Sequence, residues 1–393
     1  MKRSIRDLDI KDKRVIIRCD FNVPLKDDEI IDDTRIIESL ETIKYAIDQG
    51  AKVILMSHLG RIKSIGDLGK YNLEPVAKRL SELLNLRVRF SNRTRGEDLE
   101  EMVNKLNPGE VLLIQNTRYE DLEEKLESSN NEELASYWAS LGEIFINDAF
   151  GTLHRAHASN VGIASRIPNA IGLLVEKELQ ALSILDKPKK PYVLILGGSK
   201  IEDKIGVIEV LGKKCDEILI GGGMAFTFLK ALGKNVGDSI VDDERLEFCS
   251  EILKKYKKKI HLPVDVLAST EIDAKVASRI TSLSGIRVNE KGLDIGIESI
   301  ANFKEQLKDA QTVIWNGPLG VYEIAKYANA TNEILKFLVE NNIDTVLGGG
   351  DVVAAATKLG FKDKITHAST GGGATLEYLE GKVLPGLDII ENK

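Results

Sequence analysis

The stretch "TVLGGGDVVAAATKLG", Thr345 to Gly360, passes from β-branched apolar residues through three glycines and one acid into an alanine-rich segment. The apolar run favours a buried strand, and the alanine-rich segment after it favours a helix. Glycines at such a junction leave backbone N–H groups open to a ligand, because no Cβ shields them. The stretch therefore predicts a strand, an anion-binding turn and a helix, the unit from which α/β domains are built.

Similar units recur along the chain, so the predicted fold class is α/β, with parallel sheets covered on both faces. Four apolar runs of the first half end in Asp, Asn, His or Arg, whereas four of the second half end in glycines. They are "RVIIRCDFN", "AKVILMSHLGR", "VLLIQNTR" and "IFINDAFG", then "YVLILGGSK", "EILIGGGMAF", "TVIWNGPLG" and "TVLGGGD". Because open parallel sheets bind ligands at the carboxyl ends of their strands, the two halves predict two unlike sites.

Length and composition favour two domains and a cytoplasmic protein. The chain has 393 residues, 43% of them hydrophobic, which is more than one ordinary core needs. Its net charge of -7 argues against a nucleic-acid binder, and its three cysteines form no CxxC pair, which predicts reduced thiols. The first residues, "MKRSIRDLDIKDKR", are charged and lack the apolar h-region of a signal peptide, and no run approaches about 18 apolar residues. We therefore expect a soluble, unsecreted protein with small-molecule partners, no nucleic acid and no membrane.

Two segments have a structural as well as a functional interpretation. "PNAIGLLVEKELQALSILDKPKKP", residues 168–191, has apolar positions at helical spacing between prolines. It predicts either one more surface helix or a connector between two domains. The lysine-rich run "KKYKKK", residues 254–259, predicts a solvated helix end.

The second half carries the features of a phosphate site. It contains three glycine triplets, and "GGGDVVAAATK" and "STGGGATLEYLE" both read as strand-to-helix anion cradles. Neither GxxxxGK[ST] nor GxGxxG occurs, which argues against a P-loop enzyme and a dinucleotide dehydrogenase. Lys200 and Lys204 are four residues apart, on one face of an expected helix, and are either a solvated pair or two cations for phosphates. Asp351 is either a helix N-cap or a Mg²⁺ ligand.

The first half is marked by arginines at or just after strand ends. They are Arg35, Arg61, Arg118 and Arg155, and three histidines lie in the same motifs: His58, His154 and His157. Scattered arginines are normally surface charge, but guanidinium groups from adjacent strand ends would converge on a small anion. "HRA" at 154–156 lacks the aspartate of the protein-kinase HRD motif.

Together the two halves favour phosphoryl transfer from a nucleotide to a small anion. No residue stands out as a general base, and a carboxylate acceptor would need none because it is already ionised at neutral pH. Positioning and charge neutralisation would then supply the rate enhancement.

Eight motifs resemble those of the phosphoglycerate kinase family, in order from about residue 14 to 386. They are "RCDFNVP", "SHLGR", "DAFGTLHRAHAS", "GGSKIEDKI", "GGGMAFTFL", "WNGPLGVYE", "GGGDVVAAA" and "STGGGATLEYLEGKVLPG". The resemblance implies two Rossmann-like doubly wound domains joined by a linker helix, with a cleft between them. It also implies a monomer that reversibly transfers phosphate between Mg²⁺-bound ATP and the carboxylate of 3-phosphoglycerate, giving ADP and 1,3-bisphosphoglycerate after domain closure.

The resemblance further assigns domains and site residues. Residues 1–170, completed by 382–393, would bind phosphoglycerate, and 171–381 would bind the nucleotide, beginning with the linker helix 171–186. The implied catalytic residues are Arg35, Lys200 and Gly372. Those implied for phosphoglycerate are Asp20, Phe21, Asn22, Arg35, His58, Leu59, Gly60, Arg61, Arg118 and Arg155. Those implied for the nucleotide are Gly197, Lys204, Gly221, Gly292, Pro318, Glu323, Gly349, Gly350, Asp351 and Val352, with Asp351 as the metal ligand and Gly371–Gly373 capping the moving phosphoryl group.

Some positions depart from the family pattern. Val352 stands where Ser or Thr commonly follows the aspartate, so a hydroxyl contact to phosphate would be lost. Gln115, Tyr119 and Ile62 also replace common family residues, but none of these changes removes an implied catalytic group. The rival hypotheses are a ligase that activates another acid as its acyl phosphate and a non-catalytic nucleotide sensor. The sensor predicts a lost cation at position 35, 200 or 204, and all three are present.

Overall fold

The computed structural model describes residues 2–393, which form two compact units. Unit 1 extends to Gln180 and includes Val383–Lys393, and unit 2 is Ala181–Lys382. This boundary falls inside helix α6, Leu173–Ser183, ten residues beyond the 170/171 limit expected from the sequence. A short 3-10 turn at Ile184–Asp186 follows the helix. The assignment of a binding role to each domain stays a prediction.

Unit 1 is built on a six-stranded parallel sheet with the order β5-β6-β4-β1-β7-β8. Its strands are β1 Arg14–Arg18, β4 Lys52–Met56, β5 Val88–Phe90, β6 Val111–Leu113, β7 Ile144–Asn147 and β8 Asn169–Ile171. Its other helices are α1 Thr34–Asp48, α2 Ile65–Lys70, α3 Glu74–Leu84, α4 Glu97–Asn104, α5 Glu132–Ser140 and α14 Pro385–Asp388, and a hairpin joins β2 Leu25–Lys26 to β3 Glu29–Ile30.

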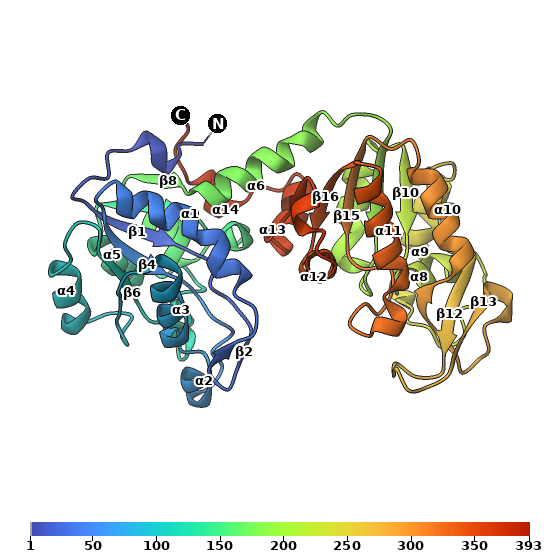
Figure 1. The fold of residues 1–393 in the computed structure, drawn as a ribbon, viewed down its shortest axis with the longest axis horizontal. Helices are drawn as coiled ribbons and strands as arrows, with labels where there is room; N and C mark the ends of the chain where they lie inside the picture. Colours follow the sequence, from blue (N-terminus) through green and yellow to red (C-terminus); the bar gives the residue numbers. More distant parts are fainter. Residues whose placement is uncertain (1) are drawn as a thin grey trace. The chain divides into compact units, whose positions relative to one another are not determined.

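The core of unit 1 lies on both faces of this sheet. Val15 and Ile17 of β1 pack with apolar residues of α1 and α3 on one face, and Figure 1 shows both helices alongside the sheet. Ile16, between them, points to the opposite face and is fully buried as well. Continuous burial of this kind is what parallel strands require, and it explains why the predicted strands read as unbroken apolar runs.

Unit 2 has a second six-stranded parallel sheet, with the order β11-β10-β9-β15-β16-β17. Counted along the chain this order is 3-2-1-4-5-6, the order of dinucleotide-binding Rossmann domains. The strands are β9 Tyr192–Leu196, β10 Glu217–Ile220, β11 Ile260–His261, β15 Thr312–Asn316, β16 Asp344–Gly348 and β17 His367–Ala368. A smaller antiparallel sheet, β13-β12-β14, joins β12 Asp265–Ser269, β13 Ser278–Ser282 and β14 Lys291–Ile295.

Seven helices of the described chain cover the sheets of unit 2. They are α7 Ile205–Leu211, α8 Ala225–Ala231, α9 Leu246–Lys255, α10 Ile297–Leu307, α11 Asn329–Glu340, α12 Gly350–Lys358 and α13 Gly373–Leu379. Figure 1 shows α10, α11 and α12 side by side, and their apolar faces share one core cluster with Val313 and Trp315 of β15. The two α/β sheets predicted from the sequence, and all eight predicted strands, are thus confirmed.

The two ends of the chain meet in unit 1. Lys2 and Asn392 form an isolated antiparallel bridge, and the backbone N–H of Arg3 donates to the carbonyl of Glu391 at 2.8 Å. The carbonyl of Arg3 accepts from the N–H of Ile171 in β8 at 2.9 Å. The last residues of the chain therefore extend the edge of the first sheet.

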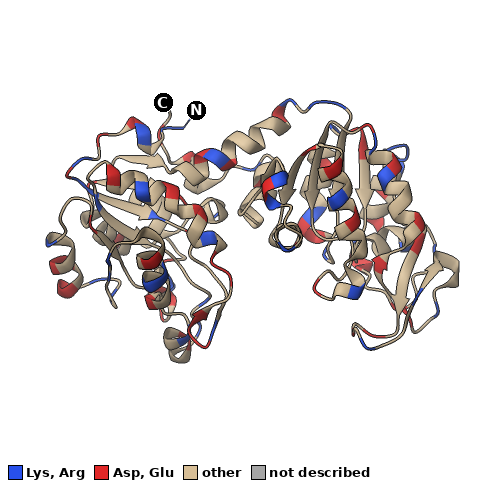
Figure 2. Cartoon of the chain, viewed as in Figure 1, with Lys and Arg blue, Asp and Glu red and all other residues tan. Residues whose placement is uncertain are grey.

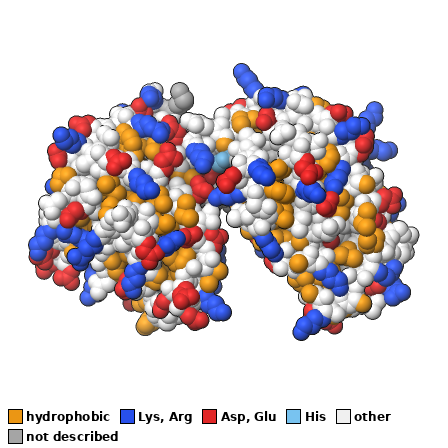
Figure 3. Space-filling view, in the orientation of Figure 1, with side chains coloured by type: hydrophobic (Ala, Val, Ile, Leu, Met, Phe, Trp, Pro, Cys, Tyr) orange, Lys and Arg blue, Asp and Glu red, His pale blue; other side chains and the backbone are white. Residues whose placement is uncertain are grey.

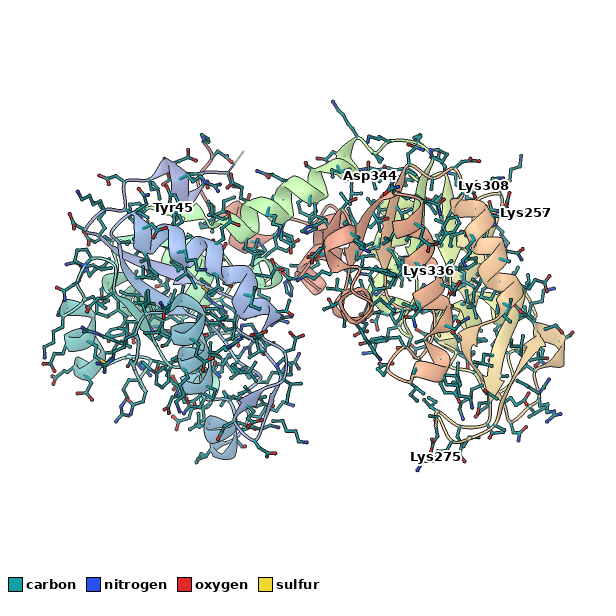
Figure 4. The ribbon with its side chains drawn as sticks, viewed as in Figure 1. Tyr45, Lys257, Lys275, Lys308, Lys336 and Asp344 are labelled. Atoms are coloured by element: carbon teal, nitrogen blue, oxygen red, sulfur yellow. The ribbon has the colours of Figure 1, made fainter. Side chains whose placement is uncertain are left out.

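The surface bears out the expectation for the lysine-rich run. Helix α9 ends at Lys255, and Lys254, Lys257 and Lys258 are exposed; Figure 4 shows Lys257 at the rim of unit 2. Basic and acidic residues are interspersed along the helices of each unit (Figure 2). On the face drawn in Figure 3, apolar side chains are scattered among them. Within residues 2–393, every helix is too short or too polar to cross a membrane.

Candidate functional site

In unit 1, polar residues gather where the strand order reverses. β1 is flanked by β4 and β7, so the chain leaves its carboxyl end in opposite directions on the two sides. Such a switch point is where open α/β sheets bind ligands. Asp20 follows β1, His58 follows β4 and Arg118 follows β6, as expected from the sequence.

Asp20 is the organising carboxylate of this group. It accepts from the Arg35 guanidinium at 2.9 Å through Oδ2, and Oδ1 lies 3.9 Å from His58 Nδ1. The backbone N–H of Asn22 also approaches Asp20 Oδ1, at 3.3 Å, and the Asn22 side chain accepts from the Gly60 N–H at 2.8 Å. The loop after β1, the start of α1 and the loop after β4 are therefore joined through side chains named in the prediction.

His58 lies among four arginines. Burial and the charges of Arg18, Arg118, Arg35 and Arg155 hold the pKa of its imidazole well below the ordinary range. Burial and three of the same arginines lower the pKa of His157 to about 3. Asp20 and Asp121 pair with Arg35 and Arg118, and several guanidinium groups beside neutral imidazoles would bind phosphate or carboxylate oxygens.

Three predicted residues occupy different environments from the rest. The side chains of Phe21 and Leu59 are buried in the core, and their N–H groups donate to Ser57 Oγ and Asn116 Oδ1. Arg61 is exposed, and within residues 2–393 its side chain forms no ion pair shorter than 4.0 Å. Arg35, His58, Arg118 and Arg155 are brought together, whereas Arg61 is outside their cluster.

The prediction missed a buried polar layer beneath the cluster. Arg18, the last residue of β1, is 1% exposed, and Glu127 and Ser159 are fully buried. An arginine that ends the otherwise apolar run "RVIIR" was the available signal, because a buried guanidinium must be paired. Glu127 lies in a turn and Ser159 in the short π-helical turn Ala158–Gly162, and neither segment is long enough to show a periodicity from which its burial could be predicted.

In unit 2 a cavity of about 290 Å³ opens at the carboxyl ends of β9, β15 and β16. Lys200, Lys204, Gly349, Gly372 and Asp351 all line it. Gly349 has φ 103° and Gly372 has φ 52°, backbone conformations that favour glycine, and these residues are the N-caps of α12 and α13, where the first N–H groups of a helix have no partner within the helix. The cavity therefore combines two cations with backbone donors, a composition suited to phosphate groups.

The two lysines do not lie on one helix face, contrary to the prediction. Lys200 lies in an irregular segment before the 3-10 turn Glu202–Lys204, and α7 begins only at Ile205. Lys200 is exposed, while Lys204 is 8% exposed. Burial lowers the pKa of the Lys204 ammonium, and the nearby carboxylates of Asp203, Asp351 and Glu380 oppose that shift. Both lysines still reach the same cavity.

Asp351 is not the N-cap of α12, so that alternative is wrong. Gly349 occupies the cap position, and the helix begins at Gly350 without a side-chain cap. The Asp351 carboxylate is exposed in the cavity and accepts from the Tyr322 hydroxyl at 3.4 Å. Val352, in contrast, is fully buried in the unit 2 core. It lines neither this cavity nor the more apolar cavity that adjoins it, so its side chain faces away from the phosphate region.

A second, more apolar cavity of about 450 Å³ adjoins the first. Gly292, Pro318, Glu323 and Asp351 line it, together with Phe226. A Cβ at Gly292 would stand 2.1 Å from the Phe226 ring, so this glycine keeps the wall of the cavity open. The predicted residues Gly197, Gly221 and Gly350 line neither cavity. Gly197 has instead a packing reason, because a Cβ there would meet the carbonyl of Pro318 at 2.2 Å.

The described residues do not form a protein cage for a metal ion. Within residues 2–393 there is no group of three or more His, Cys, Asp or Glu side chains arranged to hold one. The exposed carboxylate of Asp351 fits Mg²⁺, because that ion is commonly held by one or two carboxylates and by substrate phosphates.

Comparison with known proteins identifies the family. A model of the phosphoglycerate kinase family matches residues 5–382. The chain belongs to the phosphoglycerate kinase family. It is 52% identical to the phosphoglycerate kinase of Lacticaseibacillus casei and 49% identical to that of Macrococcus caseolyticus, in each case over the full length of both chains.

Solved structures of the phosphoglycerate kinase family agree. The enzyme from Coxiella burnetii matches with a TM-score of 0.86 at 37% identity, covering 99% of this chain and 98% of that one. The enzyme from Pyrococcus horikoshii matches with a TM-score of 0.88 at 32% identity and the same coverage. The expected phosphotransferase with a carboxyl group as acceptor is thereby confirmed, and the chain is an ATP-dependent kinase.

Proposed function

We propose that the chain transfers phosphate between ATP and the carboxylate of 3-phosphoglycerate with the residue roles that follow. Arg35, His58, Arg118 and Arg155 hold the phosphoglycerate, and Arg35 also neutralises the phosphoryl group in transit. Lys200 and Gly372 contact that same group, and Lys204 and Gly349 hold the nucleotide phosphates. Glu323, Gly292 and Pro318 take the nucleoside.

The observation that carries this proposal is the 290 Å³ cavity lined by Lys200, Lys204, Gly372 and Asp351. Its backbone donors and ammonium groups suit polyphosphate, and the adjoining cavity, lined by Phe226 and Pro318, suits a nucleoside. The arginine cluster at the switch point of unit 1 supports a small anionic acceptor. Since the acceptor oxygen is already ionised at neutral pH, no general base is required.

Mg²⁺ belongs to the same proposal. Asp351 would hold the ion together with nucleotide phosphates, and the ion would neutralise charge that develops during transfer. The helix start beside Asp351 leaves N–H donors for the phosphates themselves.

The assay that tests this function is ATP-dependent phosphorylation of 3-phosphoglycerate, followed through a coupled reductase that consumes the acyl phosphate. We expect turnover that requires a divalent cation and stops when chelator is added. Turnover with another carboxylic acid, but not with 3-phosphoglycerate, would favour the rival ligase. Nucleotide binding without turnover of either acid would favour the sensor.

We further propose that the protein acts as a cytoplasmic monomer. All three cysteines are buried free thiols, in keeping with a reducing compartment. Light scattering of the purified chain should give the mass of one copy, 43.4 kDa. A mass of twice that value at working concentration would contradict the monomer.

A further inference from the structure

Beneath the arginine cluster, the buried guanidinium group of Arg18 contacts Ser159 on one side and His58 on the other. Its Nε donates to Ser159 Oγ at 2.8 Å, and its Nη1 donates to the backbone carbonyl of Cys19. Its Nη2 lies 3.3 Å from Nδ1 of His58. Because the side chain is only 1% exposed, these contacts and the nearby carboxylates replace the water that a guanidinium would otherwise bind.

The hydrogen bonds on the far side of Arg18 have a fixed direction. Glu127 accepts from the N–H of Ser159 at 2.9 Å and from its hydroxyl at 2.5 Å. The hydroxyl proton of Ser159 is thus directed toward Glu127, which leaves the oxygen lone pairs for Arg18 Nε. Glu127 is fully buried, and it is the acid on which this series of bonds ends.

The direction of the bond between Arg18 and His58 follows from the chemistry of the guanidinium. Arginine has five N–H donors and no acceptor, so Nδ1 of His58 must offer a lone pair to Nη2. A proton on Nδ1 would set two donors against each other. Asp20 cannot serve as the acceptor for a proton on Nδ1, because its Oδ1 lies 3.9 Å from Nδ1, beyond hydrogen-bond distance.

Other charged groups around the imidazole favour the same state. Arg35, Arg118 and Arg155 add positive charge near His58, while Asp20 is already bonded to Arg35. A second proton on the ring would meet four guanidinium groups, and the nearest carboxylate has another partner.

We propose that the relay Glu127–Ser159–Arg18 holds His58 as the neutral tautomer with its proton on Nε2. His58 then binds the acceptor anion as a neutral hydrogen-bond donor, and neither as a cation nor as a base. Arg18 is a positioning residue that acts through His58. The role of the Nε2–H toward the acceptor rests on the proposed function, whereas the tautomer itself does not.

The direct test is nitrogen-15 NMR of the ligand-free full-length chain labelled at histidine. The spectrum of His58→Gln identifies the signals of residue 58 among the five histidines. We expect Nδ1 of His58 to resonate as an unprotonated ring nitrogen and Nε2 as a protonated one from pH 6 to 8. A protonated Nδ1 anywhere in that range would overturn the proposal.

A double variant tests whether the relay is the cause. Arg18→Gln with Glu127→Gln removes both charges together, so neither is left buried without its counter-charge. We expect His58 to lose its single tautomer, because the amide of a glutamine at position 18 can either donate to Nδ1 or accept from it. The KM for 3-phosphoglycerate should rise about tenfold, the worth of one lost hydrogen bond of about 1.4 kcal/mol. An unchanged His58 spectrum in a folded double variant would overturn the role of the relay.

A matched control uses another ion pair of unit 1. Arg95 and Glu120 lie 2.8 Å apart, and Arg95→Gln with Glu120→Gln removes the same two charges. This variant should leave the His58 signals and the KM unchanged; the same loss of tautomer would show a general effect of charge removal and contradict the relay. Because the spectrum needs no substrate, a chain with the expected tautomer and no kinase turnover would contradict only the proposed function.

Discussion

At the scale of single residues, Arg35 is held in place without being buried. Its guanidinium donates to Asp20 at 2.9 Å and keeps 36% of its side chain exposed, so other donors remain free for a ligand. Arg35→Ala should lower kcat about 100-fold or more, the usual loss for a donor that stabilises the transition state. The KM for ATP should change less than about threefold.

Arg87→Ala is the matched control, because Arg87 is an exposed arginine of the same unit outside the cluster. It should leave both constants within about twofold of the parent chain. Steady-state measurements of kcat and of the KM for ATP in the two variants test this expectation. Equal losses of kcat and nucleotide affinity in Arg35→Ala would contradict its position at the group in transit.

Val352 shows where family patterns mislead at this scale. Its side chain is fully buried with the unit 2 core, so a hydroxyl introduced there would enter an apolar environment. Val352→Thr should destabilise the chain by about 1–2 kcal/mol. The KM for ATP should stay within about threefold, since the backbone N–H at this position is retained.

Urea unfolding and nucleotide kinetics test this expectation against Val288→Thr, the same change at a residue that is 91% exposed. A large gain in nucleotide affinity for Val352→Thr would show that the family hydroxyl matters and that the core can accommodate it. No loss of stability would contradict the packing argument.

At the scale of elements, the start of α6 depends on one carboxylate. Asp148, directly after β7, accepts from the N–H groups of Leu174 and Val175 at 3.0 and 3.4 Å. Gly172 makes this possible, because a Cβ there would lie 2.1 Å from Asp148 Oδ1. Burial raises the pKa of Asp148 to about 7, although Thr42 and the two N–H groups lower it.

This raised pKa makes stability depend on pH. Between about pH 4 and 7 the folded chain holds a proton on Asp148 that the unfolded chain has lost, so this carboxyl contributes less stability as pH rises. Asp148→Asn keeps an oxygen acceptor and does not titrate. The free energy of unfolding of Asp148→Asn minus that of the parent chain should therefore increase from pH 4 to pH 7 and then level off.

Urea unfolding at pH 5 and pH 8 measures this difference. Burial also raises the pKa of Asp294 to about 7, but that carboxyl is present in both chains, so its contribution cancels from the difference. Asp12→Asn is the control, since Asp12 is an exposed turn residue with φ 61° that asparagine tolerates equally. A difference that stays constant between the two pH values would contradict a raised pKa at Asp148.

The sequence could predict the four central strands of each six-stranded sheet and their glycine or polar ends, because these strands belong to continuous apolar runs with abrupt terminations. It could not predict β5, β8, β11 and β17, which are two or three residues long and depend on pairing with an existing sheet. The i, i+4 interpretation of Lys200 and Lys204 failed because the glycines before them delay the helix to Ile205. Arg18 and Glu127 were missed because their partners are distant in sequence.

At the scale of the whole molecule, the two proposed binding sites belong to different units. Phosphoryl transfer requires the donor and acceptor oxygens to approach in line, so binding of both substrates must favour a state in which the units come together. Small-angle scattering should show a smaller radius of gyration with 3-phosphoglycerate and a non-hydrolysable ATP analogue than with either alone. No further compaction in the presence of both ligands would contradict the closure.

The meeting of the two chain ends in unit 1 has a consequence for biosynthesis. Residues 383–393 leave the ribosome after all of unit 2, yet they belong to unit 1, whose main segment precedes unit 2. Unit 2 is continuous in sequence and can complete its core while unit 1 still lacks the segment that pairs with Arg3. A nascent chain truncated shortly before Val383 would therefore carry a finished unit 2 together with an unfinished unit 1, and unit 1 would need protection from aggregation.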